Sequence, residues 1–443
     1  MKKVSFVTMG CPKNEVDTDY MKAFIFNDEK YIYEENLKNT DIIIINTCGF
    51  IDDAKQESID VILEAAQYKN QGIIDILIVT GCLTQRYKDE LMDEIEEIDA
   101  ILGTGTFDQI KKTIDDVLRE KKRLNRVGKS VFNFKQDLKR YNVKRHYSYV
   151  KIAEGCNNNC SYCSIPFIRG PLNSRKIEDI VEEVKILVEN GNKEIIITAQ
   201  DTTEYGKDIY GKRKLVNLLK RLIKIEHLHW IRLLYIYPEH ITEDLIEVIK
   251  NNKNICNYFD IPIQHSSNRI RKKMRREGSK KELLNIINKI KNNINDATLR
   301  TTLIVGFPGE TQKDFNDLLS FIREVKFDRL GVFKYSKEEG TKAALMKNQI
   351  SPEIKEKRYN KIMEIQQKIS YNKNKQLINQ TVEVIVDEKI EDEYIGRTMY
   401  DAPEIDNTVY IKGKNINVGD ILNVKITDCL EYDLMGEKID EPT

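Results

Sequence analysis

Three cysteines in the middle of the chain have the spacing that most clearly predicts chemistry. Cys156, Cys160 and Cys163 lie within eight residues, directly after a strand-like run from Tyr147 to Ala153. Thiolates bind zinc and iron–sulfur clusters, and a structural zinc ion takes four protein ligands. Three thiolates on one loop therefore predict a metal centre with one open coordination position. The alternatives are half of a zinc site, a redox motif or a chance grouping of loop cysteines.

The spacing of these cysteines narrows the choice. The pattern C-x3-C-x2-C, with Tyr162 directly before the last cysteine, resembles the loop of the radical S-adenosylmethionine (SAM) superfamily. The resemblance implies that the three thiolates hold three irons of a 4Fe-4S cluster. The amino and carboxylate groups of SAM would then chelate the fourth iron.

A second set of three cysteines follows strand-like runs in the first third of the chain. Cys11 follows the run 4–8, Cys48 follows 42–45 and Cys82 follows 74–79, at intervals of 37 and 34 residues that each suit one βαβ unit. A helical pattern at 53–66 supports this alternation. Residues just past parallel strands meet at one edge of the sheet, so we expect the three thiols to meet there. Three independent buried thiols are the alternative.

The length and composition of the chain limit the class of protein in which these sites lie. The chain has 443 residues, enough for two or three domains, and 71 Lys and Arg balance 71 Asp and Glu. Eight cysteines are too few for a disulfide scaffold, and their grouping favours metal in a reducing compartment. The apolar run 4–9 is too short for a signal peptide, and no run approaches a membrane span. We expect a cytoplasmic monomer with no membrane partner.

The middle of the chain carries six evenly spaced strand patterns with helical patterns between them, such as 177–189 and 281–294. They predict an α/β fold with a partial (β/α)6 barrel, in which loops after the strands carry function. The expected strands are 149–153, 194–198, 230–235, 258–263, 299–305 and 329–335. We place the domain boundaries at 1–120 (N-terminal parallel-sheet α/β domain), 121–146 (linker, rich in Lys and Arg), 147–371 (barrel with a trailing helix) and 372–443 (C-terminal domain).

Polar residues at other barrel strand ends are weaker candidates for contacts with SAM or substrate. For each of them, a structural hydrogen bond or ion pair is the better expectation. The turn 306–311 lacks the Gly-Lys-Ser/Thr ending of a phosphate-binding loop, so we expect a strand-to-helix turn with Thr311 near the helix cap. Cys256 is expected to be a core thiol. The weaker candidates are Gln200, Asp201, Arg232, Gln264, His265 and Lys334.

The C-terminal part begins with a long helical pattern from Pro352 to about Leu377 and continues with short alternating strands. The strand patterns at 381–386, 394–400, 408–411 and 421–426 predict a small antiparallel β-barrel, with Cys429 closing the last strand. Residues 372–443 contain 8 Lys and Arg against 16 Asp and Glu. An acidic surface repels a phosphate backbone, so a basic protein partner is favoured over RNA. The alternative is an acidic face that serves solubility alone.

The whole chain resembles the methylthiotransferases, radical SAM enzymes with an N-terminal cluster domain, a radical SAM barrel and a C-terminal TRAM domain. Within them it is similar to the branch that modifies an aspartate of small-subunit ribosomal protein S-twelve. The tRNA-modifying relatives usually have Gln, then Met or Asn, where this chain has Pro12 and Lys13. The motifs that carry the resemblance are 10–14 (GCPKN), 47–51 (TCGFI), 261–265 (IPIQH), 335–341 (YSKEEGT), 396–397 (GR) and 401–406 (DAPEID).

The resemblance implies two 4Fe-4S clusters and SAM as cofactors. Cys156, Cys160 and Cys163 would hold the cluster that cleaves SAM to a radical, which removes a β-hydrogen from the substrate aspartate. Cys11, Cys48 and Cys82 would hold an auxiliary cluster that delivers a methylthio group, with its methyl from a second SAM. A sulfur donor and an electron donor are implied as partners, and no protein side chain is required as an acid or base.

Two other functions remain open at this point. One is a tRNA adenosine methylthiotransferase, which uses the same chemistry on a different substrate. The other is a zinc-stabilised RNA-binding protein, which would bind zinc and contain no labile sulfide.

Overall fold

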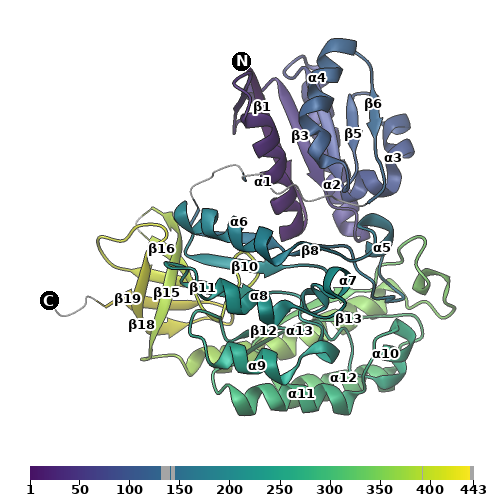
Figure 1. The fold of residues 1–443 in the computed structure, drawn as a ribbon. Coiled ribbons are helices and arrows are strands. Elements are labelled where there is room, and N and C mark those ends of the chain that lie inside the picture. Colours follow the sequence, from purple (N-terminus) through teal and green to yellow (C-terminus); the bar gives the residue numbers. More distant parts are fainter. Residues whose placement is uncertain (131–139, 141–144, 392, 440–443) are drawn as a thin grey trace.

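The chain forms three domains in a computed structural model that describes residues 1–130, 140, 145–391 and 393–439. An N-terminal α/β domain stands above a larger central domain, and a small β-barrel lies beside the central one (Figure 1). The expected linker 121–146 falls partly outside the described residues. Its first part is not a linker, because strand β6 (Leu124–Arg126) pairs with the N-terminal sheet.

The N-terminal sheet has the order β2-β1-β3-β4-β5-β6, and all of its neighbouring strands run parallel. Every residue of β3 and β4 is buried, as expected for a parallel sheet with helices on both faces. The three strands expected before the cysteines are present. The elements besides β6 are β1 (Lys2–Thr8), α1 (Pro12–Phe26), β2 (Tyr31–Tyr33), η1 (Leu37–Asn39), β3 (Ile42–Thr47), α2 (Asp52–Asn70), β4 (Ile76–Gly81), α3 (Cys82–Glu94), β5 (Ala100–Leu102), η2 (Phe107–Gln109) and α4 (Ile110–Glu120).

Alternation along β3 sends side chains to two separate cores. Ile42 and Ile44 pack with residues of α1 and α4, whereas Ile43 and Ile45 pack with residues of α2 and α3. The helices therefore cover the two faces in pairs, as the ribbon shows (Figure 1). This packing fixes the edge of the sheet at which β1, β3 and β4 end, and each of these strands is followed by a cysteine.

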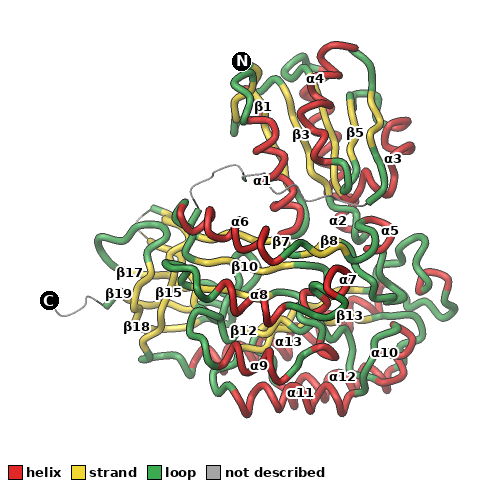
Figure 2. The backbone as a smooth tube through the Cα atoms, viewed as in Figure 1, coloured by secondary structure: helices red, strands yellow, loops and turns green. Residues whose placement is uncertain are grey.

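The central domain is a partial barrel of six parallel strands. They form two three-stranded sheets, β7-β10-β11 and β12-β13-β14, linked by a bridge between Ile231 and Ile255 and by the hydrogen bond from Ile236 N to Asp260 O (2.8 Å). Figure 2 shows the strands with their helices outside. The strands are β7 (Tyr147–Lys151), β10 (Glu194–Thr198), β11 (Trp230–Leu233), β12 (Tyr258–Asp260), β13 (Thr298–Val305) and β14 (Arg329–Lys334).

Helices follow the barrel strands, and a two-stranded antiparallel ribbon of β8 (Ala153–Glu154) and β9 (Asn173–Ser174) flanks the cysteine loop. Thr311 caps the N-terminus of α12 and forms a capping box with Asp314, which confirms the expected strand-to-helix turn. The helices are α5 (Ile165–Ile168), α6 (Ile177–Glu189), η3 (Thr202–Glu204), α7 (Lys207–Tyr210), α8 (Leu215–Leu222), η4 (Pro238–His240), α9 (Glu243–Lys250), α10 (Asn268–Met274), α11 (Lys280–Asn293), α12 (Gln312–Val325), η5 (Ala343–Leu345) and α13 (Pro352–Lys375).

The C-terminal domain is a closed barrel of five strands in the order β15-β16-β17-β19-β18. Two expectations were wrong. A fifth strand, β19, follows Cys429, and it pairs parallel with β17, so the barrel is not purely antiparallel. A short turn leads from β18 back into β19 as an antiparallel hairpin, and β19 then lies between β18 and β17. The strands are β15 (Thr381–Ile390), β16 (Glu393–Thr398), β17 (Val409–Lys412), β18 (Ile421–Cys429) and β19 (Leu434–Lys438).

Buried ion pairs join the two barrels at the end where the central strands begin. Glu194, the first residue of β10, contacts Arg232 (2.7 Å) and Arg397 of β16. Arg329, the first residue of β14, binds Asp401 through two hydrogen bonds of 2.5 and 2.8 Å. The C-terminal barrel therefore covers the end of the central barrel opposite the cysteine loop.

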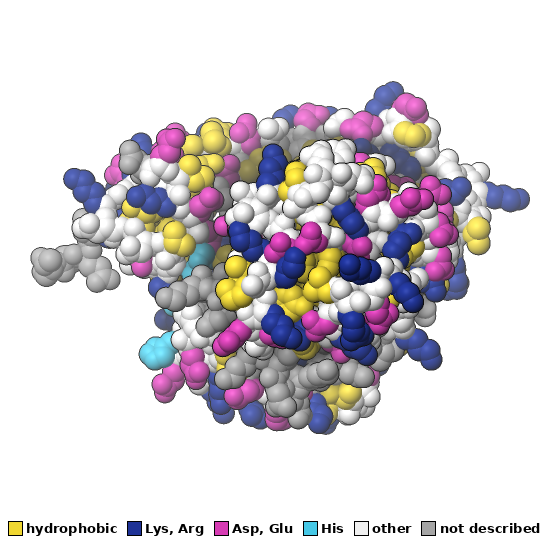
Figure 3. Space-filling view, turned by 90° about the horizontal axis from the view of Figure 1, so that it is seen from above, with side chains coloured by type: hydrophobic (Ala, Val, Ile, Leu, Met, Phe, Trp, Pro, Cys, Tyr) yellow, Lys and Arg dark blue, Asp and Glu magenta, His cyan; other side chains and the backbone are white. Residues whose placement is uncertain are grey.

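Charges of both signs are interspersed on the face seen from above in Figure 3, in keeping with the zero net charge of the chain. None of the described helices combines the length and the apolar character needed to cross a bilayer.

Candidate functional site

The loop after β8 holds Cys156, Cys160 and Cys163 in a turn fixed by backbone hydrogen bonds. Gly155 has φ +67°, and a Cβ there would lie 2.1 Å from Pro171 O, so only glycine fits. Cys156 N donates to Gly170 O (3.1 Å), and Cys163 N donates to Cys160 O (3.2 Å). The antiparallel ribbon and this turn bring the three thiols together on one short segment, which we call the loop trio.

The loop trio is anchored to distant parts of the barrel through Ser161. Its N–H donates to Met274 O (3.0 Å) and its hydroxyl to Lys273 O (2.8 Å), at the end of α10. Its carbonyl accepts from Ala343 N (2.8 Å). The loop is therefore held against the end of α10 and the segment at Ala343.

Polar groups at other strand ends reach the loop trio. The hydroxyl of Tyr237, past β11, lies 3.9 Å from Cys160 Sγ, and the guanidinium of Arg276 lies over the Tyr237 ring at 3.6 Å. Asn158 N donates to Cys156 Sγ (3.3 Å), and Asn158 Nδ2 donates to Asp201 Oδ2 (2.7 Å). Asp201 is thus the weaker candidate whose side chain contacts the cysteine loop.

Cys11, Cys48 and Cys82 lie at the ends of β1, β3 and β4, as the strand pattern predicted; we call them the strand-end trio. Glycines allow their loops to pack closely. A Cβ at Gly10 (φ +90°) would lie 2.8 Å from Cys48 Cβ, and a Cβ at Gly49 would lie 2.8 Å from Leu83 N. The three loops therefore touch through backbone that has no side chain in the way.

Asn14 connects the loops of the strand-end trio. Its Nδ2 donates to Met9 O (2.7 Å) and to Thr47 O (3.0 Å), next to Cys11 and Cys48 in the chain. Its Oδ1 lies 3.8 Å from Cys82 Sγ. Ser58 supports Cys48 from the other side, accepting from Cys48 N (3.1 Å) and donating to Cys48 O (2.9 Å). One amide and one hydroxyl thus position three loops that are distant in sequence.

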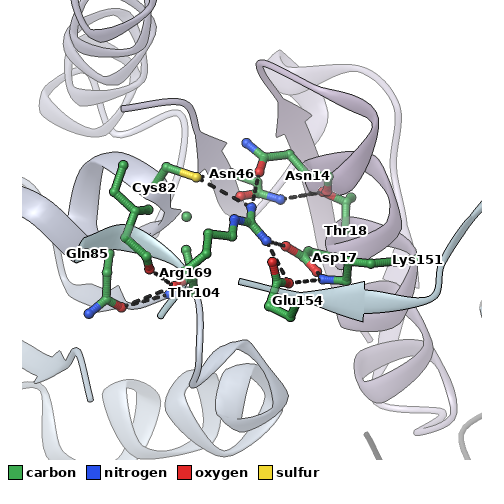
Figure 4. A network of polar contacts seen from close by, with 12 residues as sticks. Asn14, Asp17, Thr18, Asn46, Cys82, Gln85, Thr104, Lys151, Glu154 and Arg169 are labelled. Atoms are coloured by element: carbon green, nitrogen blue, oxygen red, sulfur yellow. Dashed lines mark hydrogen bonds and ion pairs between the residues drawn. The ribbon is translucent and has the colours of Figure 1, made fainter. Parts of the chain in front are cut away.

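Arg169 joins the two trios. It lies six residues after Cys163 in the central domain, and its guanidinium points into the N-terminal domain (Figure 4). Arg169 Nη2 donates to Asn14 Oδ1 (2.5 Å) and to Cys82 Sγ (3.4 Å). Arg169 Nη1 donates to Asp17 Oδ2 (2.8 Å) and to Glu154 Oε2 (3.0 Å). Its side chain is 1 % exposed, so one buried arginine connects Cys82 to Glu154, which lies two residues before the cysteine loop.

Lys151 completes this buried network. Its ammonium is bound to Asp17 and to Glu154 (2.5 Å) and is fully buried. Two cations, Lys151 and Arg169, therefore face two carboxylates across the boundary between the domains. Burial raises the pKa of Glu154, but Arg169 and Lys151 outweigh burial and hold that pKa at about 2. Glu154 is therefore ionised at pH 7, in a network of two basic and two acidic side chains.

The thiols of each trio act on one another electrostatically. Burial raises the pKa of Cys48 to about 12, and the nearby Cys82 and Cys11 add to this rise. Burial also raises the pKa of Cys156 to about 12, with Cys160 contributing. Burial opposes ionisation of Cys11 too, but Lys13 and Arg169 lower the pKa of its thiol. Thiolates that repel one another in a buried site are stabilised by a metal cation, so each donor set suits a soft metal centre.

The described side chains are not spaced to bind a single metal ion. In the part of the chain that the structure describes, no three His, Cys, Asp or Glu side chains are gathered tightly enough to hold one metal ion. The cysteines are free thiols, and those of the two trios are half-buried except for Cys82, which is buried.

The other weaker candidates lie in different surroundings. Arg232 is bound to Glu194 at the far end of the barrel, and Lys334 forms an exposed ion pair with Glu356. His265 is fully buried with its Nε2 3.6 Å from Glu310, and Gln264 has the left-handed φ of +66°. Gln200 Nε2 is buried and has no hydrogen-bond partner among the described residues. Cys256 and Cys429 are buried, as expected for core thiols.

Residues that contact the cysteines were not found by sequence reasoning. Arg169, Asn14 and Tyr237 belong to this group, and each lies close in the chain to a motif that was recognised. For Asn14, the sequence signal was a polar residue shortly after a cysteine at a strand end. The pattern Cys11-Pro12-Lys13-Asn14, with Asp17 one helical turn later, presents such residues on the first turns of α1.

Comparisons with known proteins agree with this architecture. The chain matches the Radical SAM superfamily over residues 150–322, the Uncharacterized protein family UPF0004 over residues 3–103 and the TRAM domain over residues 378–439. The fold is similar to that of the radical SAM methyltransferase TsrM from Kitasatospora setae, with a TM-score of 0.55 and 12% identity over 75% of this chain and 73% of that chain.

Relatives match over the full length. "Ribosomal protein uS12 methylthiotransferase RimO" of Clostridioides difficile is 51% identical over 100% of both chains. The protein of the same name from Clostridium botulinum (strain Hall) is 50% identical over 98% of this chain and 97% of its own length. Because it is about half identical to these relatives over essentially their full length, this chain belongs to the RimO family of radical SAM methylthiotransferases.

Proposed function

We propose that this protein methylthiolates the β-carbon of an aspartate in small-subunit ribosomal protein uS12. The observation that carries the proposal is the pair of three-thiol sets on two domains, between which the buried guanidinium of Arg169 connects Cys82 to Glu154, two residues before the cysteine loop. Radical generation alone requires one such set, and a second open cluster suits delivery of sulfur. The name shared by the full-length relatives supports the substrate.

Each trio is assigned one 4Fe-4S cluster. Cys156, Cys160 and Cys163 are the ligands of the radical SAM cluster, and Cys11, Cys48 and Cys82 are the ligands of the auxiliary cluster. When bound, the first cluster and SAM supply a carbon-centred radical, and the second supplies the methylthio group.

The side chains of this protein bind, orient and exclude water. Arg169 donates a hydrogen bond to Cys82 Sγ while its other nitrogen is held by Asp17 and Glu154, so the strand-end trio is tied to the segment that leads into the cysteine loop. Hydrogen bonds to a ligating sulfur and burial are the means by which a protein tunes a cluster. Tyr237 and Arg276 cover the loop trio from the barrel side. No side chain is assigned as an acid or base.

The proposed methylthiolation requires two partners besides the substrate. A sulfur donor must replenish the auxiliary site, and an electron donor must reduce the radical SAM cluster. We place the protein in the cytoplasm, where uS12 is made, and we expect a monomer. The acidic C-terminal barrel, with 8 Lys and Arg against 16 Asp and Glu in residues 372–443, suits contact with a basic ribosomal protein.

Mass spectrometry of a deletion strain tests the proposal. The mass of uS12 should fall by one methylthio group in the deletion strain, and the wild-type gene should restore it. Loss of methylthio from tRNA adenosine with unchanged uS12 would establish the tRNA alternative instead. Anaerobic purification followed by iron and sulfide analysis addresses the zinc alternative, since bound zinc without labile sulfide excludes radical chemistry.

A further inference from the structure

A buried carboxylate of the barrel fixes the loop that follows Cys48 in the N-terminal domain. Glu338, past the end of β14, accepts a hydrogen bond from Arg86 Nη1 (2.6 Å) on α3. The same nitrogen of Arg86 donates to Gly49 O (2.8 Å), the carbonyl directly after Cys48. The side chain of Glu338 is 2 % exposed and that of Arg86 is 7 % exposed. The carboxylate therefore holds the guanidinium in the position from which it reaches the strand-end trio.

The chain directly after Glu338 also contacts the loop trio. Ala343, five residues later, donates its N–H to Ser161 O (2.8 Å), the carbonyl directly after Cys160. In both contacts a donor is held against the backbone carbonyl that follows a cysteine. We call residues 336–343 the linking segment, because it reaches both trios by contacts of the same kind.

The linking segment is closed by a tight turn. Thr341 N donates to Glu338 O (3.2 Å), and the Thr341 hydroxyl donates to the same carbonyl (2.7 Å). Gly340, the third residue of this turn, has φ +76°, which favours glycine. The first and fourth Cα atoms of a β-turn lie within about 7 Å of each other. The turn therefore keeps the Glu338 carboxylate and the N–H of Ala343 at a defined spacing.

Two further contacts attach the linking segment to the start of α2. Lys55 Nζ lies 3.1 Å from Glu338 Oε2 and 2.5 Å from Asp52 Oδ1. Ser336 Oγ accepts from Asp52 N (3.2 Å) and donates to Glu338 Oε1 (2.6 Å). Burial opposes the charge of Lys55, but Asp52 and Glu338 outweigh burial and raise its pKa. Both oxygens of the Glu338 carboxylate therefore have partners that the structure shows.

We propose that Glu338 is a positioning residue that sets the relation between the two clusters. It holds Arg86 against Gly49 O while its own segment holds Ser161 O, so both ligand loops share one support. The proposal rests on the proposed function, in which a radical generated at the loop trio must meet the methylthio group held at the strand-end trio. Reacting atoms must lie about 3–3.5 Å apart. Methylthio transfer therefore depends on this relation, whereas SAM cleavage requires the loop trio alone.

Glu338→Gln in anaerobically reconstituted holoenzyme tests the proposal. The amide keeps the shape of the side chain and removes the charge that holds Arg86 and Lys55. A misplacement of about 1 Å can cost about 100-fold in rate, so methylthio transfer to uS12 should fall about 10- to 100-fold, with 5′-deoxyadenosine formation within about twofold of wild type. Mass spectrometry of uS12 and chromatography of 5′-deoxyadenosine measure the two rates, and their ratio should rise.

Two readouts do not require the substrate. The magnetic interaction between the two reduced clusters, measured by electron paramagnetic resonance, depends on their separation and should change in Glu338→Gln while iron and sulfide stay constant. Hydrogen exchange of the backbone amides in 47–52 should rise, because Gly49 O loses a firmly held donor. Arg86→Met should give the same two changes. The double variant should add nothing further, since both residues act as one unit.

The matched control is Tyr20→Phe, which removes another buried hydrogen bond between the same two domains. Tyr20 is 4 % exposed, and its hydroxyl donates to Glu183 Oε2 (3.0 Å) rather than to a cysteine loop. This variant should leave the product ratio and the magnetic interaction unchanged. Ser336→Ala is a milder variant, which removes the hydroxyl that contacts Glu338 and Asp52. It should change the magnetic interaction in the same direction by a smaller amount.

The outcomes distinguish the two proposals. A wild-type enzyme that leaves uS12 unmodified overturns the proposed function, and a wild-type enzyme with a single cluster overturns both. An unchanged magnetic interaction in Glu338→Gln and Ser336→Ala overturns the positioning role, even where uS12 is modified. Equal loss of methylthio transfer and 5′-deoxyadenosine, with that interaction unchanged, would assign Glu338 to stability alone. If Glu338→Gln does not retain its iron, Ser336→Ala supplies the same test.

Discussion

The two trios are built in opposite ways. The loop trio lies on eight consecutive residues, and its shape comes from local hydrogen bonds such as Cys163 N to Cys160 O. The strand-end trio comes from three strands and is assembled by the sheet, by Asn14 and by close glycine packing. The loop trio is therefore defined by one short segment, whereas the strand-end trio depends on how the N-terminal sheet folds.

This difference sets how each site responds to damage. A local site keeps its ligands together even where distant packing is perturbed, whereas an assembled site depends on every loop that forms it. Arg169 links the two, because it follows the loop trio in sequence and donates to the strand-end trio in space. Substitutions can therefore separate the two kinds of construction.

The largest effect is expected from the cysteines themselves. Replacing Cys11, Cys48 and Cys82 together by Ala should remove about half of the iron, one of two clusters, and abolish methylthio transfer while 5′-deoxyadenosine is still formed. Replacing Cys156, Cys160 and Cys163 should remove the other half and stop SAM cleavage. Iron analysis and chromatography of the nucleoside products measure both. Retention of all the iron in either variant would disprove this assignment of ligands.

A smaller but still large effect is expected from Arg169→Met. Asp17 and Glu154 would then share Lys151 as their remaining cation, and breaking a buried ion pair costs about 3–5 kcal/mol. Denaturant unfolding measures this loss. Arg169→Lys should restore only part of it, because an ammonium cannot reproduce the forked contacts. Arg119→Met removes an exposed arginine and should change little. An unchanged unfolding midpoint in Arg169→Met would show that the two trios are held together by other contacts.

An intermediate effect, confined to one trio, is expected from Gly10→Ala. The new Cβ would lie 2.8 Å from Cys48 Cβ, and φ +90° adds backbone strain of about 1–3 kcal/mol. The matched control is Gly72→Ala, which has φ +69° with nothing within 4 Å of the new Cβ. Iron content should fall in the first variant and stay constant in the second. Equal iron loss in both would mean that strain, rather than packing against Cys48, is responsible.

The smallest effect on either trio is expected from Glu194→Gln, at the opposite end of the barrel. Burial opposes the charge of Glu194, but Arg232 and Arg397 lower its pKa below the usual range. A lowered pKa stabilises the fold above the ordinary value of about 4.3, and this stabilisation is lost as pH falls below it. Thermal unfolding should therefore separate variant from wild type at pH 7 and less at pH 3.5. Cluster spectra should match, and a changed spectrum would show that the two barrel ends are coupled.

Short-range sequence patterns predicted the features that are formed by residues close together in the chain. The loop trio, the capping residue Thr311 and the barrel strand 194–198 follow from short-range spacing, and each is present. The strand-end positions of Cys11, Cys48 and Cys82 were also predictable, because parallel strands share an edge. Strand β19 and its parallel pairing with β17 were not, because the choice of neighbour is decided by how the barrel closes.

Contacts across domain boundaries could not be predicted either. Arg169 and Asp17 are 152 residues apart, and nothing in their local sequence indicates that they meet. Lys13 looked like an ordinary residue at the start of a helix, and its burial against Tyr235 comes from domain packing. The proposed cysteine ligands were therefore accessible to sequence reasoning, whereas the residues that contact them across the domain boundary were not.

The position of Arg169 in the chain also orders events during synthesis. The N-terminal sheet is complete at Arg126, where β6 ends, and Arg169 is made 43 residues later. At a translation rate of roughly 5–20 residues per second, this gap lasts about 2–9 s. A nascent chain can thus form the pocket of the strand-end trio before the guanidinium that later closes it exists. Until Arg169 is made, Cys82 lacks the guanidinium that donates to its Sγ in the finished protein.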